Sequence, residues 1–243
     1  MPGVMHYSLE TYRKNARLIL LFSLSFLIAF AIPILAAFPT FNDAGAILIR
    51  TSSLFYFNLT PLSASVIIIA SIFSLLFLSF AIVSINVIVK HSRMHVRVSA
   101  EVLKGIEKYT GRIFAVLGLF MLAIFASEIL TYGIKPVGLI TAIVGLALTP
   151  FVFYAPASIV MEDSRIGRAM KRSAKFFASG FGYFLIWLAM AIAATILINL
   201  LFITAVPSFS EYLSIIVNSI LVMPFLIVFQ SEAYLKKFPM MRR

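Results

Sequence analysis

Cysteine is absent from the 243-residue chain, and charged residues are scarce. Without cysteine, the protein can form neither disulfides nor thiolate metal sites. Charged residues make up 12% of the sequence, about half of what soluble domains carry, and hydrophobic residues make up 62%. A soluble protein of this length cannot bury so much apolar surface. The composition therefore predicts a polytopic integral membrane protein.

Acidic residues are the rarer charges, since 9 Asp and Glu stand against 20 Lys and Arg. Such an excess can reflect nucleic-acid binding, anionic lipid or membrane topology, and the positions of the basic residues distinguish these. Six segments reach the length of about 20 apolar residues that a membrane-spanning helix needs. The predicted spans are about 18–38, 62–89, 113–132, 137–160, 183–206 and 212–231.

The basic residues fall almost entirely on one side of these spans. All but Arg50 and Lys135 lie in the amino-terminal flank, the loops after the second and fourth spans, and the tail. The positive-inside rule then predicts a plasma-membrane protein with both termini in the cytoplasm. Topology accounts for the charge, so no nucleic-acid partner is predicted. The predicted fold is an all-α bundle of six transmembrane helices, forming a single membrane domain over residues 1–243.

Three basic amphipathic stretches precede the odd-numbered spans. They begin at Ser8, Ser99 and Ser164, and each serine is a candidate helix cap. The pattern predicts three units, each with a helix at headgroup level followed by a transmembrane hairpin. Alternatively, ordinary juxtamembrane segments share this pattern. The predicted contacts to anionic lipid are Lys104, Lys108, Arg112, Arg168, Lys171 and Arg172.

One outer loop, residues 39–61, is long. Asn42 is a candidate helix cap, and the following run as far as Phe57 is too apolar for a free aqueous loop. It predicts a short helix that lies on or dips into the membrane. Pro61 suits the first turn of the second span. Asn58 begins an N-glycosylation sequon close to the bilayer, and its modification stays open.

The stretch P-A-S-I-V-M-E-D-S-R-I-G-R-A-M-K-R-S, from Pro156 to Ser173, resembles a loose group of prokaryotic, mainly archaeal, six-span membrane proteins. Some of that group are labelled as similar to the membrane domain of glycerophosphoryl diester phosphodiesterase. The matching residues are Pro156, Glu162, Ala169 and Ser173, and the opening Y-R-K-N-A-R-L-I-L-L is similar too. The resemblance implies architecture without an activity, because the soluble phosphodiesterase domain and its metal site have no counterpart here.

Glu128 is the one acid placed well inside a predicted span. At 1.5 Å per residue it lies roughly 22 Å beyond the start of that span. Asn199 and Asn218 approach a similar depth and can hydrogen-bond to each other across two antiparallel spans. Glu128 can join them in a polar layer. Such a layer predicts a polar constriction or a proton or cation site, or alternatively contacts that only hold the helices together.

Prolines interrupt three predicted spans, at Pro33, Pro150 and Pro224. Each removes a backbone hydrogen bond and favours a kink, so the three are candidate hinges. Prolines are also ordinary in membrane helices, which leaves a structural interpretation open.

No catalytic, cofactor or metal site is predicted. His91 and His95 have the spacing of metal ligands on one helix face, but no acidic or thiol partner is nearby. Glu162 and Asp163 are predicted to cap the helix that follows them. No serine–histidine–carboxylate set and no phosphate loop can be made out.

Three functions are compatible with these features, and the first of them fits best. An oligomeric pore or transport-related protein is favoured by the polar layer and the kinked spans. A lipid-interacting scaffold, or a partner of another membrane protein, is favoured by the basic helices. A membrane-embedded enzyme is disfavoured because acids and histidines do not converge. Membrane lipids and further copies of the chain are the predicted partners in both leading cases.

Overall fold

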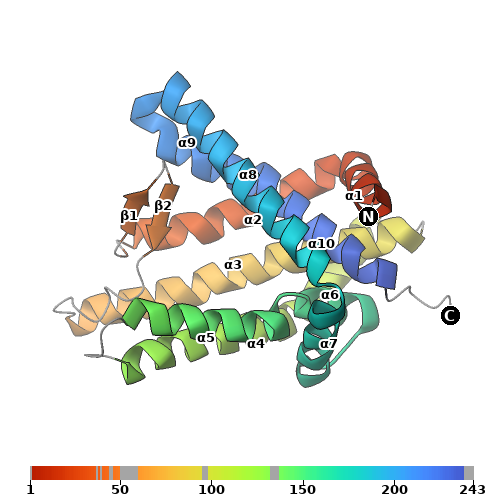
Figure 1. Cartoon of the computed structure of the whole chain (residues 1–243), viewed down its shortest axis with the longest axis horizontal. Coiled ribbons are helices and arrows are strands. Elements are labelled where there is room, and N and C mark those ends of the chain that lie inside the picture. Colours follow the sequence, from red (N-terminus) through yellow and green to blue (C-terminus); the bar gives the residue numbers. More distant parts are fainter. Residues whose placement is uncertain are drawn as a thin grey trace.

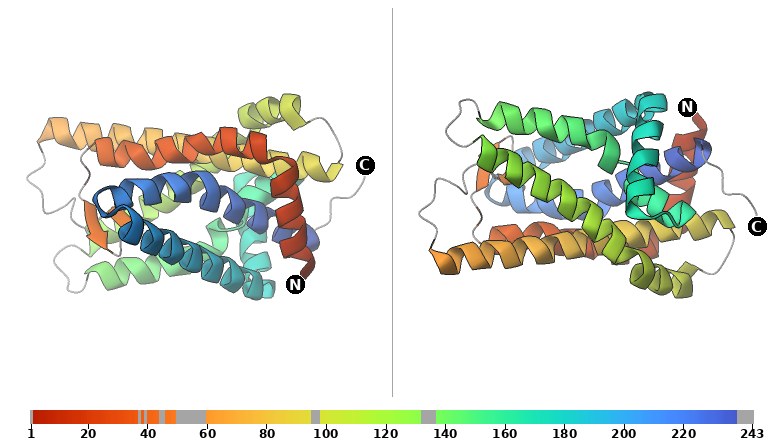
Figure 2. Two further views of the ribbon diagram at one scale, coloured as in Figure 1. Left: turned by 90° about the horizontal axis from the view of Figure 1, so that it is seen from above. Right: turned by 90° about the horizontal axis from the view of Figure 1, so that it is seen from below.

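The computed structural model describes residues 2–36, 38, 40–43, 46–49, 60–94, 98–131 and 137–237. Most helices run along one direction, and two shorter ones lie across them (Figures 1 and 2). The elements are α1 (Pro2–Lys14), α2 (Ala16–Leu35), β1 (Thr40–Asp43), β2 (Ala46–Ile49), α3 (Pro61–Met94), α4 (Val98–Leu130), α5 (Val137–Val152), α6 (Ala155–Glu162), α7 (Ile166–Ser179), α8 (Phe181–Ala205), the 3₁₀ turn η2 (Pro207–Phe209), α9 (Ser210–Val217), the π-helical turn η3 (Asn218–Val222) and α10 (Met223–Lys237).

Six segments of the described chain are long and apolar enough to cross a membrane, and each overlaps one predicted span. They are Ala16–Leu35, Pro61–Arg93, Val102–Leu130, Leu139–Glu162, Phe181–Ala205 and Pro207–Lys237. The all-α six-helix bundle is therefore confirmed. Helix α5 packs beside α4, and α9 beside α8. Pro61 begins α3, also as predicted.

Two of the spans are interrupted helices. The fourth divides into α5 and α6, and Phe153 and Tyr154 lie between them. Pro156 then occupies the first turn of α6, where its missing N–H costs nothing. The sixth span contains η2, α9, η3 and α10 in succession, and Pro224 is the second residue of α10, just beyond η3. Prolines thus stand at both interruptions.

The outer loop contains a β-hairpin in place of the predicted helix. Strand β1 pairs antiparallel with β2, from Thr40 opposite Ile49 to Asp43 opposite Ala46. The helix prediction is wrong for Ala46–Ile49, because β-branched Ile47 and Ile49 favour a strand and a glycine in the preceding sequence favours a turn. Residues 50–59, which include the sequon at Asn58, lie outside the described residues.

The predicted three-fold repetition is only partly present. Helices α1 and α7 are separate and lie across the bundle near one end, divided from the following spans at Asn15 and Gly180 (Figure 2). The stretch from Ser99 is instead continuous with its span, because no proline or cap interrupts α4. The capping prediction for Ser8 is also wrong. Helix α1 begins at Pro2, so the Ser8 hydroxyl lies inside it and donates to the Val4 carbonyl at 2.7 Å.

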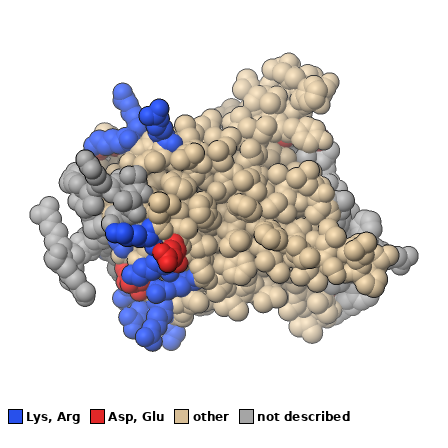
Figure 3. Space-filling view, turned by 180° about the vertical axis from the view of Figure 1, so that it is seen from behind, with Lys and Arg blue, Asp and Glu red and all other residues tan. Residues whose placement is uncertain are grey.

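Buried residues gather at one end of the bundle. This end, called the basic end below, comprises α1, α6, α7 and the adjoining parts of α2, α3, α4, α8 and α10, and Lys and Arg cluster there (Figure 3). Every residue of 81–89, 154–161 and 226–235 is buried. At the opposite end the helices expose leucine and isoleucine, and α8 buries only Asn199 along its whole length. Helix α1 contacts α10, so both lie at the basic end.

Candidate functional site: buried polar contacts at the basic end

A run of polar side chains near the end of α10 connects the helices of the basic end. Residues Gln230–Tyr234, called the α10 polar segment below, are all buried, and four of the five are polar. Each of these four side chains bonds to a different part of the chain. The segment is polar around its circumference because other helices surround it and supply partners, which buried polar groups require.

Glu232 is the charged residue of this segment, and its side chain is fully buried. Its carboxylate accepts from Arg93 of α3, with Nη2 at 2.5 Å and Nε at 3.0 Å, and from Thr11 Oγ1 of α1 at 2.9 Å. The Arg93 guanidinium also lies 4.2 Å from the centroid of the Tyr7 ring. The buried carboxylate is therefore compensated by a charge-assisted pair that joins α1, α3 and α10.

The other three side chains extend these connections. Ser231 Oγ donates to Asn86 Oδ1 of α3 at 2.8 Å. Gln230 donates to the carbonyl of Phe153, between α5 and α6. Tyr234 donates its hydroxyl to Glu162 of α6 at 2.5 Å, and that carboxylate also pairs with Arg172 of α7.

Ser173 of α7 bridges the break in the helix between α5 and α6. Its hydroxyl donates to the Pro150 carbonyl at 2.7 Å and accepts from the Tyr154 N–H at 2.9 Å. In an unbroken helix, these two backbone groups would bond to each other. Ser173 replaces the lost helical bond, and it is fully buried beside the equally buried Ala169. Residues of the Pro156–Ser173 stretch thus pack α6 and α7 together.

The three candidate hinge prolines have different surroundings. Pro33 leaves the Ala29 carbonyl without its helical donor, and Ser74 of α3 donates to that carbonyl at 2.7 Å. Pro150 is bridged by Ser173 as described above. Pro224 is buried in the first turn of α10. Two of the three prolines are therefore held by a serine from a neighbouring helix, and their role as hinges stays a prediction.

Asp163 forms ion pairs with two of the predicted lipid-contacting cations. Lys108 Nζ lies 2.6 Å and Arg112 Nη1 2.7 Å from its carboxylate. The hydrogen bond from Lys108 is the main reason why the pKa of Asp163 lies below its ordinary value. The predicted capping role of Asp163 is wrong, since Arg165 precedes α7 without a side-chain cap. Glu162 is likewise committed to Tyr234 and α7 rather than to a cap.

The remaining predicted lipid contacts differ in what surrounds them. Arg172 is half-buried and paired with Glu162, whereas Arg168 and Lys171 are exposed on α7. Lys104 is exposed on α4. Within the described ranges neither Arg168 nor Lys171 takes part in an ion pair.

The predicted polar layer is divided between different parts of the bundle. Glu128 is 2% exposed on α4, which packs chiefly against α3 and α5. Asn199 lies on α8 and Asn218 on η3, which contact each other. No hydrogen bond joins these two asparagines: in the described part of the chain, the Oδ1 atom of each is buried without a partner, as is Ser214 Oγ.

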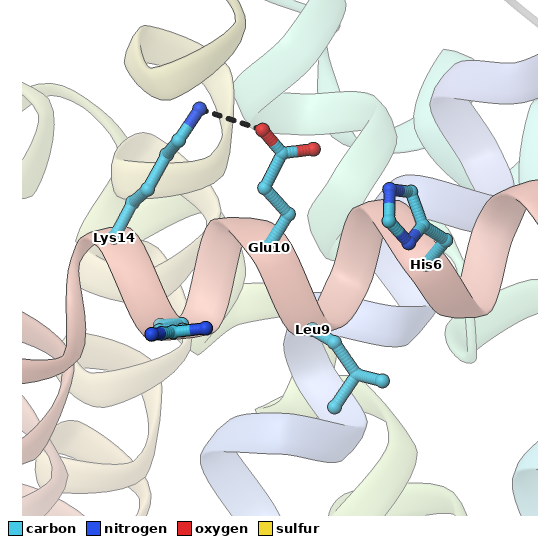
Figure 4. A pocket seen from close by; sticks show the side chains of 5 residues that line it. His6, Leu9, Glu10 and Lys14 are labelled. Carbon is cyan, nitrogen blue, oxygen red and sulfur yellow. Dashed lines mark hydrogen bonds and ion pairs between the residues drawn. The ribbon is translucent and has the colours of Figure 1, made fainter.

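A shallow hollow on α1 is lined by His6, Leu9, Glu10, Arg13 and Lys14. Glu10 and Lys14 point toward each other and form an ion pair at 2.6 Å, while Leu9 points away (Figure 4). This hydrogen bond lowers the pKa of Glu10. Because one exposed helix supplies every lining residue, the hollow is a surface feature rather than an enclosed site.

Sequence reasoning missed Glu232, Arg93 and Ser173. The predicted sixth span ended at Ser231, which placed Glu232 in the tail. The signal was present, because Ala233, Tyr234 and Leu235 continue the apolar pattern beyond the acid. Ser173 was singled out only by the family resemblance. Pro150 predicts a kink, but the sequence does not show that Ser173 of another helix lies beside it.

Comparison with known protein families, curated proteins and solved structures finds no match for this chain. The resemblance to the six-span prokaryotic group therefore stays a prediction. Within the described ranges, no three His, Cys, Asp or Glu side chains gather in a way that can hold a metal ion.

Proposed function

We propose that the protein is a non-catalytic membrane module whose basic end binds anionic lipid headgroups through α7. The observation that carries this proposal is a row of exposed cations, Arg168, Lys171 and Lys175. Their spacing of three and four residues places them on one face of the helix. The helix lies across the bundle, roughly at the level where its spans end (Figure 2). Headgroup phosphates are expected at that level.

The opposite face of α7 is fixed to the protein. Ala169, Ser173 and Phe176 are fully buried, and α7 packs against α5 and α6. The amphipathic pattern of α7 is thus explained by burial against other helices, where the sequence predicted an apolar face in lipid. This packing holds the cationic row in a fixed orientation, so little side-chain or backbone order has to be gained when a headgroup binds.

The charge of the row is not neutralised internally. Neither Arg168, Lys171 nor Lys175 makes an ion pair among the described residues, in contrast with Arg112 and Arg172. A cation near an anionic membrane surface contributes about 1 kcal/mol of attraction. The row therefore supports selection of anionic over zwitterionic lipid.

Lipid selectivity in detergent tests this proposal. Delipidated protein is incubated with equal amounts of phosphatidylglycerol and phosphatidylcholine, and bound lipid is counted by native mass spectrometry. We expect K171Q/K175Q to lose roughly 30-fold in phosphatidylglycerol binding, because two cations are removed. The matched control is R13Q/R17Q, which removes two exposed cations elsewhere at the basic end. Equal binding of both lipids, or equal losses in both variants, would contradict the proposal.

A second candidate function is an oligomeric pore or transport-related protein. It is supported by the polar atoms without partners at the opposite end, and by Asn199 as the one buried residue of α8. This candidate predicts ion or solute flux in proteoliposomes and a changed flux in Glu128→Gln at unchanged thermal stability. The absence of flux in the wild-type protein would count against it.

A further inference from the structure

The hairpin of α8, η2, α9 and η3 has an inverted distribution of polarity. Its buried residues are all polar, namely Asn199, Ser210, Ser214 and Ser219. Leucines and isoleucines of the same helices, such as Leu197 and Leu200, are more than half exposed. Apolar side chains on the lipid-facing surface are expected in a membrane. Polar side chains that are buried on the other side of these helices need hydrogen-bond partners there.

Three polar side-chain atoms of the hairpin have no hydrogen-bond partner among the described residues. Asn199 Oδ1, Ser214 Oγ and Asn218 Oδ1 are buried without a hydrogen bond within the described residues. Asn199 is 4% and Ser214 1% exposed. The contrast with the neighbouring serines is direct, because Ser219 donates to the Ile215 carbonyl at 2.6 Å and Ser210 to the Pro207 carbonyl at 3.1 Å. Ser214 makes no such bond, so its hydroxyl remains available to another group.

The hairpin connection places Asn199 and Ser214 at a similar depth, and Asn218 lies about one helical turn from Ser214. Asn199 lies eight residues before Pro207, and Ser214 lies seven residues after it. Ser214 and Asn218 are four residues apart and therefore share one helix face. Helix α8 contacts both α9 and η3, and Asn199 is the one residue that α8 buries. The π-helical turn begins at Asn218, and such turns are frequent at functional sites.

We infer that Asn199, Ser214 and Asn218 form a hydrated site, occupied by water that enters from the opposite end of the bundle. A buried polar group without a partner costs about 1 to 3 kcal/mol, and hydrocarbon supplies no donor. Water donates to the two amide oxygens and exchanges bonds with the hydroxyl, and a buried water commonly makes about three hydrogen bonds. The inference is independent of headgroup binding at α7, because the two sites lie at different ends.

The absence of cysteine makes this inference directly testable. Single variants Ser214→Cys and Asn199→Cys are reconstituted into liposomes and treated with a charged, membrane-impermeant thiosulfonate. Only a thiolate reacts, and a thiolate forms only where water is present. The matched control is Leu200→Cys, because Leu200 is next to Asn199 at the same depth and is 58% exposed on the lipid-facing side. We expect both test variants to react at least tenfold faster than the control.

Two further variants make the result decisive. Asn199→Leu in the Ser214→Cys background fills the site with an apolar side chain and is expected to slow labelling several-fold. Asn218→Cys takes the place of either test variant that fails to elute as a single species in gel filtration. Labelling at Ser214, Asn199 and Asn218 as slow as at Leu200 would overturn the hydrated site, and so would equal rapid labelling at Leu200.

Discussion

The basic end and the opposite end of the bundle both bury polar side chains, but they differ in the hydrogen bonds that these side chains make. At the basic end, Glu232 is bonded to Arg93 and Thr11, and Ser173 is bonded to two backbone groups. At the opposite end, Asn199 and Ser214 are as deeply buried, and their side-chain oxygens have no hydrogen-bond partner in the part of the chain that the structure describes. Polar residues within spans are therefore not equivalent, because the partner on the neighbouring helix decides whether they stabilise the bundle.

This difference assigns different physical properties to the two ends. The interlocked side chains of the basic end raise the free energy of local opening there, whereas α8, with a single buried residue, has little tertiary packing to hold its far half. Rigid display of charge is possible at the basic end. Entry of water is possible at the opposite end.

The largest expected effect comes from removing the buried carboxylate. Glu232→Ala leaves Arg93 without its anion and Thr11 without its acceptor, so the free energy of unfolding should fall by about 3 kcal/mol. Ser214→Ala at the opposite end should change it by less than about 0.5 kcal/mol, because no protein hydrogen bond is lost. The fluorescence of Trp187, the one tryptophan, reports unfolding because its indole N–H is bonded to the Leu226 carbonyl.

Equal destabilisation by these two substitutions would remove the distinction between the ends. The double variant R93A/E232A serves as a control for the ion pair. It should be more stable than Glu232→Ala alone, because it no longer contains a cation without a partner.

The spans could be predicted from the sequence because their apolar runs are longer than those of soluble proteins. The start of the second span could be predicted as well, since α3 begins at Pro61. The side chains that bond to one another across helices could not be predicted. Hydrophobicity gives the depth of Glu128 and Asn199 in the membrane but not the direction in which each faces around its helix. Asn199 is buried on α8, which contacts α9 and η3, whereas Glu128 is buried on α4, which packs chiefly against α3 and α5, so the predicted layer is divided.

Glu232 and Arg93 were missed for the same reason, because hydrophobicity does not show which side chains meet. Glu232 and Arg93 are separated by 139 positions, and nothing local relates them. The hairpin at Thr40–Ile49 was missed for another reason. An apolar segment of that length is equally compatible with a helix or a strand, and glycine at the connection was the only local signal.

An intermediate effect is expected at the interruption between α5 and α6. Ser173→Ala leaves the Pro150 carbonyl and the Tyr154 N–H without the bridging hydroxyl, and should lower the free energy of unfolding by about 2 kcal/mol. Ser179→Ala, on the exposed side of the same helix, should be nearly neutral. The measurement is again detergent unfolding followed by Trp187. Stability of Ser173→Ala equal to that of Ser179→Ala would show that the bridge is dispensable.

The smallest effect concerns an exposed ion pair within the basic end, and it separates charge from burial. Asp163→Asn keeps the left-handed backbone, φ 51°, that asparagine also tolerates, but loses the charge that Lys108 and Arg112 contact. Exposed pairs contribute little, so the loss at pH 7 should be about 0.5 kcal/mol. Since these contacts lower the pKa of Asp163, its contribution is present above the ordinary carboxyl pKa of about 4 and is lost as the pH falls through the folded-state value. The difference in stability between the wild type and Asp163→Asn should therefore be largest near pH 7 and should shrink steadily as the pH falls below about 4. A difference that does not change with pH over this range would mean that the variant acts through the turn rather than through its charge.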